Sequence, residues 1–104
     1  MTESISRHYD MGYRAQEFAD VLCGPFSGED SAFRVEPDGR LRWRVTHVSS
    51  AFDMQITLET RPDRKLGLMN LPVLSVDFDC RVDENGAGEQ FFHRFHQYFH
   101  KGGG

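Results

Sequence analysis

Residues 51–60 read AFDMQITLET and alternate between apolar and polar side chains. Successive side chains of a β-strand point to opposite faces of a sheet, so this segment predicts a strand with one buried face. The apolar face consists of Phe52, Met54, Ile56 and Leu58. A fully buried parallel strand would be apolar on both faces. The pattern therefore favours an antiparallel sheet that is covered on one side only.

The preceding segment, residues 40–47, reads RLRWRVTH and has the same two-residue period. A four-residue loop over residues 48–51 would join the two segments as an antiparallel hairpin. In that register the apolar side chains of both strands share one face. The expected pairs are Val45 with Met54 and Trp43 with Ile56.

Residues 31–36, SAFRVE, predict a short strand before this hairpin. The sequence from Pro37 to Gly39 is typical of a tight turn, because proline suits its first position and glycine tolerates a left-handed backbone. A three-residue turn would place all the apolar residues on one face. The expected pairs are Val35 with Leu41 and Phe33 with Trp43.

A fourth strand is predicted at residues 72–82, PVLSVDFDCRV. Its inward positions would be Leu74, Val76, Phe78, Cys80 and Val82. A simple meander, in which each strand pairs with the next, is the default order. The long connector before this strand would also allow it to lie beside the first strand.

Two helices are predicted, one at each end of the chain. Residues 9–23 carry apolar side chains at helical spacing, with Asp10 as the N-cap and Gly24 as the stop signal. The second helix would run from an N-cap at Asn85 to about Lys101. Its core face would consist of Phe91, Phe92, Phe95, Tyr98 and Phe99.

These segments predict one α+β domain over residues 1–104, with the element order α-β-β-β-β-α. The two-layer fold would have a four-stranded antiparallel sheet, with the N-terminal and C-terminal helices packed on its apolar face. Residues 1–8 and 102–104 are expected to be flexible ends.

Three histidines form a stripe beside the aromatic face of the second helix: His93, His96 and His100. One metal ion cannot bind both ends of this stripe, because His93 and His100 are about 10 Å apart along a helix. A pair can chelate, either His93 with His96 or His96 with His100, and zinc or another transition metal would need further ligands from elsewhere. The alternative interpretation is that imidazoles, which are half apolar, suit the border of an aromatic face.

The connector RPDRKLGLMNLP, residues 61–72, is longer than a strand hairpin needs. It presents four large apolar side chains after a basic stretch: Leu66, Leu68, Met69 and Leu71. One interpretation is that the connector packs over the open end of the core. The other is that it is exposed and binds a protein partner or a second copy of the chain.

The formal net charge of −4 argues against nucleic-acid binding, which needs clustered and unopposed basic residues. The arginines on the polar sheet face are expected to pair with acids of neighbouring strands. We find no apolar run that could cross a membrane and no export signal, which predicts a soluble cytoplasmic protein. Cys23 and Cys80 form no metal or redox motif.

The sequence shows no catalytic constellation and no cofactor motif. It therefore predicts a small non-catalytic accessory domain that docks on a protein partner or on itself through the Leu66 to Leu71 segment. The alternative is a metal-binding protein that uses His96 and His100 with further ligands.

Overall fold

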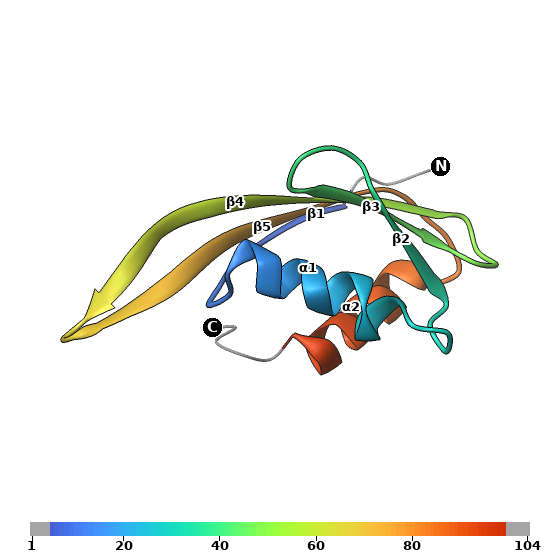
Figure 1. Cartoon of the computed structure of the whole chain (residues 1–104). Coiled ribbons are helices and arrows are strands. Elements are labelled where there is room, and N and C mark those ends of the chain that lie inside the picture. The colour runs from blue at the N-terminus through green and yellow to red at the C-terminus, as the bar shows by residue number, and fades with distance from the viewer. Residues whose placement is uncertain (1–4, 100–104) are drawn as a thin grey trace.

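The computed structural model describes residues 5–99 and shows an α+β fold with one antiparallel sheet (Figure 1). The elements are β1 (Ile5–Met11), α1 (Ala15–Cys23), the short 3₁₀ helix η1 (Pro25–Ser27), β2 (Phe33–Pro37), β3 (Arg42–His47), β4 (Phe52–Leu66), β5 (Met69–Asp83) and α2 (Ala87–Tyr98). The predicted α+β class and antiparallel sheet are confirmed. The predicted count of four strands is wrong, because the sheet has five.

The additional strand, β1, is formed by the residues before α1 and pairs antiparallel with β5. The sheet order is β1-β5-β4-β3-β2. The predicted helix over residues 9–23 is therefore too long: it begins at Ala15, and Asp10 lies in β1 instead of capping it. Residues 5–8, expected to be flexible, belong to β1, whereas residues 1–4 and 102–104 lie outside the described residues.

Both helices lie on the same side of the sheet, and the hydrophobic core fills the space between the two layers (Figure 1). The ring of Phe78 on β5 lies 5.1–5.9 Å from the rings of three phenylalanines of α2. Edge-to-face pairs of this kind add about 0.5–1.5 kcal/mol each beyond the burial of apolar area. The inward strand positions Met54, Ile56, Leu58, Leu74, Val76, Phe78 and Cys80 are all buried, as the alternation predicted, while Val82 is half-buried.

The register of the β3–β4 hairpin is the predicted one, with Val45 opposite Met54 and a four-residue loop before β4. The predicted β2–β3 register is wrong, because Val35 pairs with Val45 and Phe33 with His47. Here Leu41 adopts a left-handed backbone (φ 55°) in a longer loop, and its carbonyl oxygen accepts a hydrogen bond from the Leu58 amide. A shift by an even number of residues leaves every side chain on its face, so alternation alone cannot detect it.

The start of α2 is fixed by the side chain of Asp83, the last residue of β5. The Gly88 amide donates a hydrogen bond of 2.8 Å to the Asp83 carboxylate, which satisfies one of the free amides at the helix N-terminus. Asn85, the predicted N-cap, instead adopts a left-handed backbone in the turn before the helix. The helix ends at Tyr98 and not near Lys101. Within residues 5–99, neither helix combines the length and apolar character that a membrane span requires.

Candidate functional site

The β4–β5 hairpin extends far beyond the rest of the sheet. Pairing between β3 and β4 ends at Thr57, and pairing between β1 and β5 ends at Leu74. Beyond these points the two strands pair only with each other within the described part of the chain. We call this projecting part, residues 59–73, the arm; Figure 1 shows it running away from the two helices.

The tip of the arm is a two-residue turn between Leu66 and Met69, which pair with each other. Gly67, at the first turn position, has a φ of 61°, while Leu68 at the second has an ordinary negative φ. This is the pattern of a type II′ turn, whose twist matches that of the flanking strands. The expectation of a connector over residues 61–72 that is longer than a hairpin needs is therefore wrong, because both strands continue up to this two-residue turn.

The arm tip exposes large apolar side chains. Every residue from 61 to 70 is exposed, and Leu66, Leu68 and Met69 are 56%, 104% and 62% exposed. Leu71 is half-buried. The interpretation that this segment covers the open end of the core thus fails, and the interpretation that it is an exposed surface agrees with the structure.

The apolar side chains of the arm lie on one face of the hairpin. Leu74 faces the core, so the alternation of β5 turns Val73, Leu71 and Met69 toward the opposite side. A bulge between Arg61 and Arg64 shifts the phase of β4. As a result, Leu66 lies opposite Met69 and joins the same face. An apolar stripe thus continues the outer, solvent side of the sheet.

A cavity of about 490 Å³ lies at the other end of the sheet, beside α2. It is lined by Arg7, Met54, Cys80, Asp83, Gly88, Glu89, Phe92, His93 and His96. The structure therefore brings His93 and His96, two of the three predicted metal ligands, to one cavity, and both are exposed. His100 lies outside the described residues.

Three of the side chains that line this cavity have defined local surroundings. Burial raises the pKa of the Cys80 thiol to about 11, so the thiol is protonated and is no nucleophile near neutral pH. The Arg7 guanidinium lies 4.2 Å from the centre of the Phe92 ring, and Asp83 is engaged with the Gly88 amide. Within residues 5–99 no three histidine, cysteine or acidic side chains are placed to hold a metal ion.

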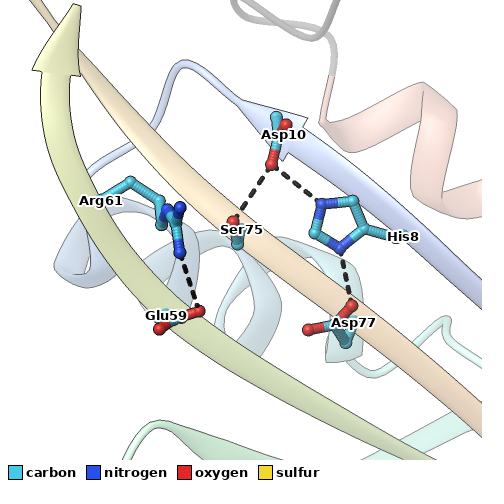
Figure 2. A network of polar contacts seen from close by, with 6 residues as sticks. All are labelled: His8, Asp10, Glu59, Arg61, Ser75 and Asp77. Carbon is cyan, nitrogen blue, oxygen red and sulfur yellow. Dashed lines mark hydrogen bonds and ion pairs between the residues drawn. The ribbon is translucent and has the colours of Figure 1, made fainter.

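A polar network crosses from β1 to β5 on the outer face of the sheet. Figure 2 shows the His8 ring between two carboxylates, with Nδ1 2.6 Å from Asp77 and Nε2 2.9 Å from Asp10. Ser75 donates its hydroxyl hydrogen to Asp10 over 3.1 Å. A carboxylate at each ring nitrogen favours the imidazolium form of His8, in which both nitrogens donate. The network is a clamp for the edge strand, and sequence analysis missed it because β1 was not recognised.

This clamp is expected to depend on pH. Hydrogen bonds to Asp77, then to Asp10, raise the pKa of His8 above 6.5, and the bond from His8 lowers the pKa of Asp10 below 3.8. The histidine contribution is complete below the unfolded pKa of 6.5 and is lost as pH rises through the higher folded pKa. The aspartate contribution is complete above 3.8 and is lost as pH falls through the lower folded pKa.

An NMR titration of His8 should show its pKa falling toward 6.5 in Asp77→Asn, because this variant removes the hydrogen bond that raises the pKa most. An unchanged pKa would contradict the clamp.

Two arginines of the outer sheet face, Arg42 and Arg44, make hydrogen bonds to other residues of the chain. Arg44 makes two hydrogen bonds of 2.9 Å to the Asp53 carboxylate of the neighbouring strand, which raises the pKa of Arg44. Arg42 bonds the Asp38 carbonyl oxygen over 2.9 Å. The expected cross-strand charge pairing is thus confirmed for Arg44.

None of the family models, curated proteins or solved structures compared with this chain matches it.

Proposed function

We propose that the protein is a non-catalytic interaction domain that docks on another protein molecule through the apolar tip of the arm. The observation that carries this proposal is the exposure of Leu66, Leu68 and Met69 at the end of a projecting hairpin. Soluble proteins seldom leave large apolar side chains gathered in water unless the surface is used for binding. The cytoplasmic location and the absence of nucleic-acid binding expected from the sequence are part of the same proposal.

The shape of the arm supports docking rather than a role in folding. A two-stranded hairpin is at best marginally stable alone in water, and both edges of the arm lack a neighbouring strand within the described residues. A partner that covers the apolar stripe would remove this weakness. Pro62 and the bulge beside it interrupt the edge of β4, so side-chain docking is favoured over the addition of a strand there.

Replacing Leu68 and Met69 together by serine should abolish association while leaving the fold intact. Each of these side chains contributes about 1.5–3 kcal/mol when it is fully buried, so losing both weakens binding by at least about 100-fold. Neither side chain is buried within the chain, so the melting temperature should change little. The measurements are thermal unfolding by circular dichroism and quantified association of the untagged protein in extracts of its own host and in purified form.

Val48→Ser is the matched control, because Val48 is also exposed, at 52%, but lies in the loop between β3 and β4. It should associate like the unmodified protein. If the double serine variant unfolds, or if it associates as strongly as Val48→Ser, the arm tip is not the docking surface.

A second candidate function is transition-metal binding at the histidines of α2. The observation that favours it is that His93 and His96 line one cavity together with Cys80, Asp83 and Glu89, all of which can be metal ligands. A bound ion would require these side chains to move closer together, because no three such ligands among residues 5–99 are placed to hold one. Zinc or another transition metal should then remain with untagged protein in elemental analysis and be lost in His96→Ala. Protein that retains no metal and takes up no zinc would end this proposal.

A further inference from the structure

The arm tip and the cavity lie at opposite ends of the same two strands. The cavity is lined by Met54 of β4 and Cys80 of β5, whereas the tip is formed by Leu66 and Met69. Met54 and Leu66 are twelve residues apart along β4, which corresponds to about 40 Å in an extended strand. The arm therefore cannot reach the cavity of its own chain.

The two surfaces are complementary in chemistry. Residues 61–70 contain three basic residues and one acid, so they carry +2 in a chain of net charge −4, which leaves −6 on the rest. The cavity offers an apolar floor of Met54, Cys80 and Phe92. Its charged lining residues are Asp83, Glu89 and Arg7, and the Arg7 guanidinium lies against the Phe92 ring. An apolar tip beside basic side chains fits an apolar floor beside acids, and such complementarity selects partners and speeds their encounter.

The rim of the cavity contains one acid that is available to a partner. Asp83 already accepts the hydrogen bond from the Gly88 amide. Glu89 is exposed and makes no ion pair with any of residues 5–99, and the same holds for Arg64 and Lys65 on the arm. The volume of about 490 Å³ is in the range of cavities that enclose small ligands, which is enough space for apolar side chains of a turn.

We propose that the occupant of the cavity is the arm tip of a second copy of this chain, in a closed pair in which each copy inserts its tip into the other. This inference rests on the proposed function and names its partner. Two elongated molecules placed side by side in opposite directions bring each tip to the other molecule's cavity end. Both contacts then form at once around a twofold axis, so the assembly stops at two copies.

The test is the native mass of the untagged protein, measured by light scattering at the highest soluble concentration. We expect twice the 12.0 kDa of one chain. Glu89→Lys should weaken the pair about tenfold or more, because it places a cation against the basic arm. Combining Glu89→Lys with Arg64→Glu and Lys65→Glu should restore it. Gln90→Lys is the control: it introduces the same lysine side chain at an exposed neighbour that does not line the cavity, and the pair should persist.

Each other result overturns the inference in a recognisable way. A monomer overturns it, and the proposed function survives only if Leu68→Ser with Met69→Ser still abolishes association with another protein. A pair that the serine variant dissociates but Glu89→Lys does not means that the arm docks elsewhere than in the cavity. Masses of three or more copies would exclude the closed pair. A pair that the serine variant leaves intact would overturn both proposals.

Discussion

Phe91→Ala is expected to lower the free energy of unfolding by about 3–5 kcal/mol, the usual cost of removing a fully buried phenylalanine ring. The Phe91 side chain is 0% exposed. Its ring lies 5.2–6.0 Å from the rings of Phe26, Phe33, Phe52 and Phe78, which come from η1 and three strands. Alanine would leave a cavity. The four rings cannot move together to fill it, because each is held in position by a different helix or strand. Domains of this size are stable by only about 5–15 kcal/mol, so the variant should be close to unfolding.

The measurement is urea unfolding followed by circular dichroism, with His93→Ala as the control on the same helix. His93 is exposed, so its replacement should change the unfolding free energy by no more than about 0.5 kcal/mol. A loss below about 1 kcal/mol for Phe91→Ala would mean that α2 does not pack against the sheet in the way described.

The parts of the fold that the sequence predicted are those in which burial repeats with a regular period. The aromatic arc of α2 and the alternation of β4 are long enough that only one element type fits each. The same alternation placed Val45 opposite Met54 correctly, since a one-residue slip would have turned apolar side chains to water. The alternation could not show that Val35 pairs with Val45 instead of Leu41. The two registers differ by four residues, and an even shift leaves every side chain on the same face of the sheet.

The strand β1 was not predicted because its pattern is too weak on its own. Among its described side chains, the apolar ones that pack in or against the core are Tyr9 and Met11, and Met11 also fits the helical spacing of the residues that follow. What makes these residues a strand is the open edge of β5, a tertiary feature that a local pattern does not contain. The facing pair of His8 and Asp77 becomes visible only once this pairing is known.

The sequence identified the apolar residues of the arm tip but not the hairpin that carries them. The apolar side chains of residues 66–71 indicate a binding surface. The sequence does not show that this segment continues β5, because the apolar residues of LPVL, residues 71–74, fall on both faces of a strand. These residues mark the place where β5 leaves the core, so that Leu74 is buried while Leu71 turns to the other side. The cavity was not predicted, because its lining combines β1, both long strands and α2.

Arg94→Met is expected to lower the unfolding free energy by about 1.5–3 kcal/mol, because it removes the charged donor of hydrogen bonds between α2 and η1. The Arg94 side chain is only 17% exposed. Its Nε donates a hydrogen bond of 2.8 Å to the Phe26 carbonyl oxygen, and its Nη2 donates one of 3.3 Å to that of Pro25. The guanidinium also lies 4.7 Å from the centre of the Tyr98 ring. Methionine keeps the aliphatic packing but leaves the η1 carbonyl groups without this donor.

Arg94→Lys separates the effect of charge from that of geometry. A lysine ammonium keeps the positive charge but cannot reach two adjacent carbonyl groups with a planar fork, so the variant should fall between the unmodified protein and Arg94→Met in urea unfolding. Gln97→Met, at an exposed position of the same helix, should have little effect. If Arg94→Met is as stable as Gln97→Met, the carbonyl groups of η1 find water instead, and the contact between η1 and α2 depends on the Phe26 ring alone.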